Sequence, residues 1–149
     1  MFYLFIIAVS LVIYLVIMVP FILNIQNTLT AVTPSNRKME SAMAWIMIIP
    51  VVASVWIFIL SKRLSQSIES ELKERNIPVK PEPTYMIGLV YGILSAVGVV
   101  IQWLDISSII SKLISIAIIV FFIIYWVAVD KYKNILRRPF LVLQQAEQA

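Results

Sequence analysis

Four long apolar stretches separated by polar connections dominate the chain. They cover residues 2–23, 41–60, 85–104 and 109–129. Each stretch has close to the ~20 residues that an α-helix needs to cross the hydrocarbon of a bilayer. The first stretch carries no charge and lacks the basic start of a signal peptide, so we expect it to be retained. The pattern predicts an all-α integral membrane protein with four transmembrane helices, forming one membrane domain over residues 1–149.

The second apolar stretch continues without a helix breaker into a charged segment, residues 61–77. Leu64, Ile68 and Leu72 recur there every four residues, which predicts a narrow apolar stripe along one helix face. Two acid–base pairs at i, i+4, each worth ~0.2–0.5 kcal/mol, support the helix. They are Glu69–Lys73 and Glu71–Arg75. We therefore expect an amphipathic cytoplasmic extension whose stripe either rests on headgroups or on the C-terminal tail, or docks a partner.

Two further features shape the predicted helices. Pro50 lies in the middle of the second stretch, where it removes a backbone donor and clashes with the preceding turn, so we expect a kink there. The fourth stretch continues into a polar tail, residues 130–149, of which the part before Pro139 is expected to prolong the helix.

Small residues recur along one face of the third stretch. Gly88, Gly92 and Ala96 stand four positions apart, and Ser95 and Gly98 add two more small side chains. Such a face lets another helix approach closely, which favours association inside a membrane. Because only four residues join the third and fourth stretches, we expect the fourth helix to occupy this face. A contact with another chain remains the alternative.

Basic residues suggest which side of the membrane each connection occupies. Four crossings would place both termini on one side, and nine Lys and Arg lie in the 61–84 connection and the tail, against three elsewhere. The positive-inside rule then predicts that both termini are cytoplasmic. Several of the basic side chains are candidate contacts for anionic lipid headgroups or a partner protein. These are Arg37, Lys38, Lys131, Lys133, Arg137 and Arg138.

Composition argues against most kinds of chemistry. Hydrophobic residues make up 61% of the chain, and histidine and cysteine are absent. Thiolate nucleophiles and the usual ligands of zinc, haem and iron–sulfur clusters are therefore missing. No charged residue falls in the central part of a predicted span, where proton and ion pathways usually show one. We expect no enzymatic activity, cofactor, metal or nucleic-acid partner.

Short motifs add a resemblance. Residues 36–39 (NRKM) precede a span with Trp45 and Pro50, residues 67–73 (SIESELK) form a charged helix, and residues 125–126 (YW) lead to residues 131–133 (KYK). Together they resemble a group of small bacterial multi-span membrane proteins. The resemblance implies a location in the bacterial cytoplasmic (inner) membrane and no particular activity.

Three functions agree with these features. The first is an accessory or scaffolding subunit that packs against another membrane protein or itself through the small-residue face. The second is a small oligomeric transporter or channel with a path lined by Tyr14, Ser54, Tyr91 and Ser95. The third is a membrane protein that binds anionic lipids.

Overall fold

The computed structural model describes residues 2–104 and 108–138, which form helices and no strand. The elements are α1 (Phe2–Thr30), the 3-10 helix η1 (Ser41–Ile48), α2 (Pro50–Glu74), α3 (Tyr85–Trp103) and α4 (Ser108–Arg137). The predicted all-α class is confirmed. The helices α1, α2 and α4 are long and apolar enough to cross a membrane, and α3 carries a shorter apolar stretch, Tyr85–Ile101.

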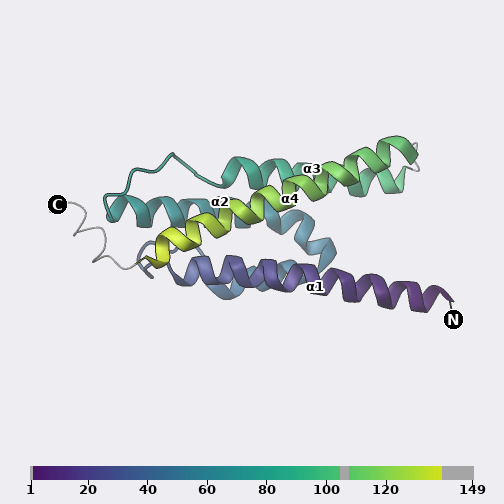
Figure 1. Cartoon of the computed structure of the whole chain (residues 1–149), viewed down its shortest axis with the longest axis horizontal. Helices are drawn as coiled ribbons and strands as arrows, with labels where there is room; N and C mark the ends of the chain where they lie inside the picture. The colour runs from purple at the N-terminus through teal and green to yellow at the C-terminus, as the bar shows by residue number, and fades with distance from the viewer. Residues whose placement is uncertain (1, 105–107, 139–149) are drawn as a thin grey trace.

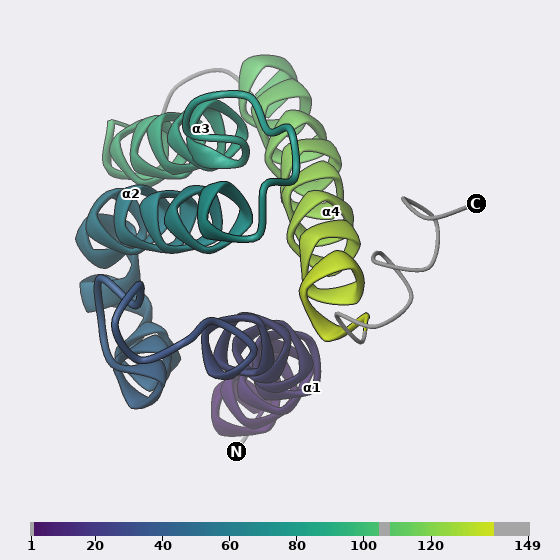
Figure 2. The ribbon, with the colours of Figure 1, turned by 90° about the vertical axis from the view of Figure 1, so that its left-hand side faces the viewer.

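The helices lie side by side in an elongated bundle (Figure 1). Viewed along the bundle, α2 lies beside α3, and α4 runs past α3 towards α1 (Figure 2). One end, which we call the polar end, holds residues 31–40, 61–84 and 130–138. The opposite, far end holds the start of α1, the end of α3 and the start of α4.

The connection after α1 lies on the same side as the extension of α2, contrary to the four-crossing prediction. The backbone N–H of Thr33 donates to Glu71 Oε2 at 2.9 Å, and the backbone N–H of Lys38 donates to Ser67 Oγ at 2.8 Å. Two segments joined by such bonds cannot lie on opposite faces of a bilayer. The start of α1 and the end of α4 consequently lie at opposite ends of the molecule (Figure 1).

Pro50 breaks the second apolar stretch instead of kinking it. The residues before it form η1, Ile49 is extended (φ −92°, ψ 110°), and Pro50 occupies the first turn of α2. Proline is well tolerated there, because its missing N–H would have no intrahelical partner and its φ already suits a helix. The expected single span over residues 41–60 is therefore two short arms that meet at Ile49–Pro50.

Side chains replace some of the backbone hydrogen bonds lost at this break. The hydroxyl of Tyr14 donates to the carbonyl of Met47 at 3.0 Å, and Trp56 Nε1 donates to the carbonyl of Met43 at 3.1 Å. Both carbonyls belong to η1. The backbone hydrogen bonds of a 3-10 helix have poorer geometry than those of an α-helix, so the two side-chain bonds add support. These two bonds attach η1 to α1 and to α2.

The small-residue face of α3 is used within the chain, by both α2 and α4. A Cβ added at Gly88 would lie 2.3 Å from Ser61 Oγ, and one added at Gly92 would lie 2.9 Å from a ring carbon of Phe58. Gly98 faces Ile118 of α4 instead. All three glycines are therefore approached by side chains of the same chain. The expected neighbour, α4, is wrong for Gly92, which meets only α2 because α2 returns to the polar end directly beside α3. Gly88 is approached by both helices, since Tyr125 of α4 also lies 3.0 Å from the added Cβ. Ser95 and Ala96 are half-buried beside them.

The stripe on the extension of α2 lies in the hydrophobic core. Leu64, Ile68 and Leu72 are buried together with residues of α1 and α4, such as Ile25 and Val129. The docking interpretation of this stripe is wrong for the chain in this arrangement, because the chain itself covers it. The ion pairs beside it are confirmed, with Lys73 Nζ 2.5 Å from Glu69 and Arg75 Nη2 2.6 Å from Glu71. The tail prediction is confirmed as far as Arg137 and otherwise concerns residues 139–149, outside the described part.

Candidate anionic-headgroup site

The connection between α1 and η1 is held in place by one buried carboxylate on α2. Glu71 accepts hydrogen bonds from the backbone N–H and the hydroxyl of Thr33 and from the amide of Asn36, at 2.9–3.0 Å. Arg75 donates two more bonds to Glu71 and a third to the carbonyl of Leu136 at the end of α4. Charge-assisted bonds of this kind are stronger than neutral ones. They fix residues 33–38 against α2.

This attachment brings three cations from two distant segments into one place. Arg37 and Lys38 follow Asn36 in the connection, and the hydroxyl of Ser67 accepts the Lys38 N–H while donating to the carbonyl of Arg63. Arg63 lies one turn before Ser67 on α2. The three basic side chains therefore share one side of the polar end, although 25 positions of sequence separate Lys38 from Arg63.

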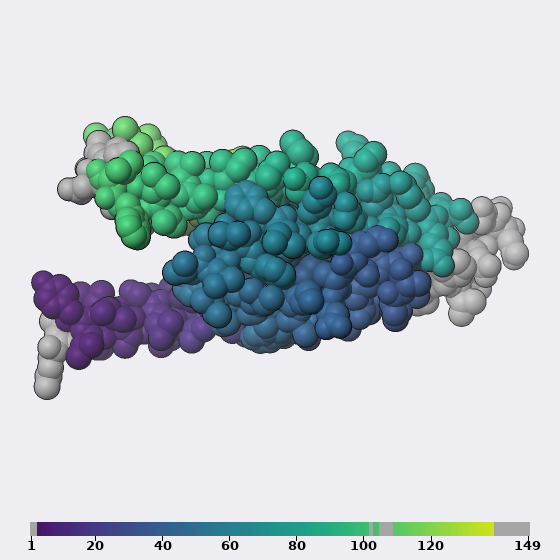
Figure 3. Space-filling view, turned by 180° about the vertical axis from the view of Figure 1, so that it is seen from behind, coloured from purple at the N-terminus to yellow at the C-terminus, as the bar shows by residue number. Residues whose placement is uncertain are grey.

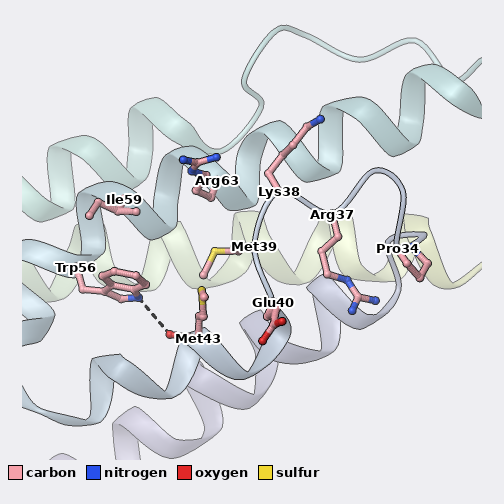
Figure 4. Close-up of a pocket in the computed structure, with 9 residues that line it drawn as sticks. All are labelled: Pro34, Arg37, Lys38, Met39, Glu40, Met43, Trp56, Ile59 and Arg63. Atoms are coloured by element: carbon pink, nitrogen blue, oxygen red, sulfur yellow. Dashed lines mark hydrogen bonds between the residues drawn. The ribbon is translucent and has the colours of Figure 1, made fainter.

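The three cations line a pocket at the surface of the polar end. It has a volume of about 570 Å³. Figure 4 shows Lys38 and Arg63 on neighbouring elements, with Met39 and Met43 lying between the connection and Trp56. Trp56 closes one side and donates its hydrogen bond to the carbonyl of Met43 (Figure 4). The remaining lining residues are Pro34, Glu40 and Ile59.

The pocket carries an excess of positive charge. It contains three cations and one carboxylate, Glu40, and the ion pairs found among the described residues include none of these four side chains. Arg37 donates from Nη2 to the carbonyl of Val32 at 3.1 Å, while its Nε is buried and makes no hydrogen bond. Lys38 and Arg63 are exposed, so their side chains can donate to an anion with several acceptor oxygens, such as a phosphate.

The apolar side of the pocket opens onto a hydrophobic helix face. Met43 is 40% exposed, Ile59 46% and Val55 67%. Val55, Ile59 and Arg63 follow one another at i, i+4, i+8, so an apolar strip on α2 leads directly to a guanidinium. A headgroup bound by the cations would place its acyl chains along this strip. The arrangement thus fits a lipid better than a free anion.

The basic residues of the tail do not line this pocket. Lys133 donates to Asn24 Oδ1 of α1 at 2.6 Å and pairs with Asp130, so its charge is used to join α4 to α1. Lys131, Arg137 and Arg138 are exposed. Of the six cations selected from the sequence, Arg37 and Lys38 line the pocket.

Sequence reasoning missed Arg63 and Trp56 as site residues. In the sequence, Arg63 is one of the basic residues of the 61–84 connection, predicted to lie on the side opposite to Arg37 and Lys38, and Trp56 is one residue of the second apolar stretch. The i, i+4 line from Val55 to Arg63 was a signal for a lipid-facing strip that ends in a charge. This spacing alone could not reveal the site, because the 31–40 connection was predicted to lie on the opposite side of the membrane.

Comparisons with known proteins assign no family or function to this site. A scan against protein-family models finds no match, and searches of the curated proteins and of the solved structures find no similar protein. Within residues 2–104 and 108–138, no group of His, Cys, Asp and Glu side chains is arranged to hold a metal ion. The function must therefore be argued from the site itself.

Proposed function

We propose that this chain is a non-enzymatic integral membrane protein that binds an anionic phospholipid at the cytoplasmic surface of a membrane. The observation that carries the proposal is the pocket of Figure 4, which is lined by Arg37, Lys38 and Arg63 and also by Ile59 of the exposed apolar strip on α2. A phosphate group would bind the cations, and the strip would line the acyl chains. Basic residues near the surface attract anionic lipid by about 1 kcal/mol each.

The membrane arrangement that supports this proposal has three crossing helices and one re-entrant hairpin. In it α1, α3 and α4 cross, while η1 and the apolar start of α2 enter from the polar end and return to it. At 2.0 and 1.5 Å per residue, η1 and residues 50–60 are each about 16 Å long, roughly half of the ~30 Å hydrocarbon thickness. Ile49–Pro50 then lies near the middle of the bilayer.

The distribution of charge supports an orientation for this arrangement. Of the 12 Lys and Arg residues, all but Lys112 fall in the three segments of the polar end. By the positive-inside rule, the polar end faces the cytoplasm. The start of α1, which lies at the other end, then faces the opposite side of the membrane, and only the end of α4 is cytoplasmic.

The scaffolding hypothesis remains a prediction with less to support it. The sequence feature that suggested this hypothesis was the small-residue face of α3. In the structure, α2 and α4 already occupy the positions around Gly88, Gly92 and Gly98. A partner would have to use another surface. The lipid-binding proposal needs no such surface, because its site is open in the single chain.

The proposal is tested by removing two pocket charges whose side chains form no hydrogen bond within residues 2–104 and 108–138. We expect Lys38→Gln/Arg63→Gln to weaken the binding of short-chain phosphatidylglycerol roughly 25-fold, because two basic residues contribute about 2 kcal/mol. Native mass spectrometry of the protein in detergent measures the affinity, with phosphatidylcholine as the neutral lipid.

A matched control separates the pocket from general charge. Lys62→Gln/Lys131→Gln removes the same net charge from exposed positions at the polar end that do not line the pocket. This variant should bind phosphatidylglycerol within about twofold of the unchanged chain. Equal losses in both double variants, or equal binding of both lipids by the unchanged chain, would contradict the proposal.

A further inference from the structure

Two adjoining cavities lie at the tip of the re-entrant hairpin. The first, of about 120 Å³, lies between α1, η1, α2 and α3, and the second, of about 230 Å³, lies between α2, α3 and α4. Both are lined by Ser54 and Ser95, so these two serines mark the place where the cavities meet. The site is separate from the headgroup pocket, which shares none of its lining residues.

Hydroxyl groups concentrate around these cavities. Tyr14 and Tyr91 line the first, Ser111 and Ser115 line the second, and no charged side chain lines either. All four residues of the path predicted from the sequence therefore surround the first cavity. A lining of hydroxyls without charge suits an uncharged molecule that can donate and accept hydrogen bonds.

Several of these hydroxyls retain hydrogen-bonding capacity. Tyr14 donates to the carbonyl of Met47, and Ser54 and Ser115 donate to the carbonyls four residues before them, at 3.3 and 2.9 Å. Each has thereby used its one proton and kept its acceptor lone pairs. Ser95 Oγ is buried and makes no hydrogen bond of ordinary geometry, although the Tyr91 hydroxyl is its neighbour.

The depth of the site makes a dry cavity costly. In the proposed arrangement the tip of the hairpin lies near the middle of the hydrocarbon, where lipid supplies no hydrogen bonds. A hydroxyl left without a partner in such surroundings costs on the order of 1–3 kcal/mol. Water enters protein cavities that are polar and roomy enough to give it two to four partners. Both volumes exceed what one water molecule needs.

We propose that these cavities form a hydrated site within the membrane that binds a small uncharged hydrogen-bonding solute of the amide or polyol class. The tyrosine and serine hydroxyls supply the bonds, and the lack of charge in the lining excludes ions. The proposal is independent of lipid binding at the polar end and can fail without affecting it.

The chain has no cysteine, so single cysteines report on this site directly. Ser54→Cys and Ser95→Cys place a thiol in the cavities with little change of volume. Val55→Cys and Val97→Cys are the controls, because both positions are exposed on the outer faces of α2 and α3. The probe is iodoacetamide, itself a small uncharged amide, applied to the chain in phosphatidylcholine vesicles.

We expect the cavity thiols to be alkylated about tenfold faster than the controls or more, because only a hydrated thiol ionises and the thiolate is the nucleophile. An excess of acetamide should slow alkylation of the cavity thiols and leave the controls unchanged. Equal rates at all four positions would overturn the hydrated site. Fast alkylation that acetamide does not slow would overturn solute binding. Size-exclusion chromatography of each variant confirms that it is folded.

Discussion

The two ends of the molecule are built in different ways. At the polar end, segments far apart in sequence are joined by Glu71, Arg75 and Lys133 around a core that includes Ile68 of α2. At the far end, the large apolar side chains of α1 from Tyr3 to Ile17 are exposed, with Tyr14 half-buried. Figure 3 shows this half of α1 standing apart from the α3–α4 hairpin.

The difference shows what holds each part of the chain. The polar end is stabilised by hydrogen bonds and packing between its own residues, as a water-soluble domain would be. The far end lacks such contacts on most of α1, and lipid is as apolar as the side chains that face it, so little drives its helices together. The polar end therefore sets the arrangement of helices, and the far end follows it.

Removing the carboxylate of Glu71 should affect stability most. Glu71→Ala leaves Arg75 partly buried without its ion-pair partner and removes the acceptor for Thr33 and Asn36. We expect the free energy of unfolding in detergent to fall by about 3 kcal/mol, the lower part of the range for breaking a buried pair, since Arg75 retains some contact with water. Chemical denaturation followed by circular dichroism measures the change.

Glu69→Ala is the control for this prediction. It removes the same kind of carboxylate from the same helix, but its ion-pair partner Lys73 is exposed, and its other hydrogen bond comes from the backbone N–H of Glu82. Exposed pairs contribute about 0–1 kcal/mol. Similar losses in the two variants would show that Glu71 does not hold the polar end together.

Two phenylalanines of α1 test the comparison within one helix. Phe21 is fully buried, and its ring centroid lies 4.8 Å from that of Phe122 and 5.6 Å from that of Trp126. Phe5 is 68% exposed at the far end. We expect Phe21→Ala to lower the free energy of unfolding by about 3 kcal/mol, since it leaves a cavity among aromatic rings.

Phe5→Ala, the same substitution at the far end, should cost less than about 0.5 kcal/mol, as at other sites without packing partners. Thermal unfolding in one detergent compares the two variants. If Phe5→Ala were as costly as Phe21→Ala, the far end of α1 would be packed as tightly as the core around Phe21, and the comparison would fail.

The sequence was sufficient for the helices and insufficient for their arrangement. Apolar length located α1, α3 and α4 as single helices, whereas the second stretch is divided between η1 and α2. The i, i+4 spacing correctly predicted the pairs at Glu69 and Glu71. Pro50 was recognised as a disruption, but a proline inside a long apolar run fits both a kink and a new helix start. The choice between them depends on bonds from Tyr14 and Trp56 that join residues far apart in sequence.

The headgroup site could be predicted only in part for the same reason. Arg37 and Lys38 stood out as a local cluster, but their meeting with Arg63 depends on the bond between Lys38 and Ser67. The charge count assumed that residues 41–60 cross the membrane, so it placed Arg37 and Lys38 on the side opposite to Arg63. A re-entrant hairpin instead returns to the side from which it entered. Hydropathy does not distinguish a re-entrant hairpin from a crossing helix, because the same apolar residues can form either one.

The glycines of α3 give the smallest and most selective test. Gly88→Ala would place its Cβ 2.3 Å from Ser61 Oγ and 2.7 Å from Ser61 Cβ near the polar end, whereas Gly98→Ala meets the flexible end of Ile118 at 2.8 Å. We expect Gly88→Ala to cost about 1–2 kcal/mol through overpacking. Gly98→Ala should be neutral or slightly stabilising, because alanine favours a helix by about 1 kcal/mol over glycine.

A second substitution identifies the contact responsible. Ser61→Gly in the Gly88→Ala background removes the atoms that the new methyl group meets, so it should recover most of the lost thermal stability beyond what Ser61→Gly alone allows. Recovery would show that α2 and α3 are in contact in the membrane-embedded chain at this position. Without recovery, or with equal losses at Gly88 and Gly98, the close approach of α2 to α3 would not be what holds the bundle near its polar end.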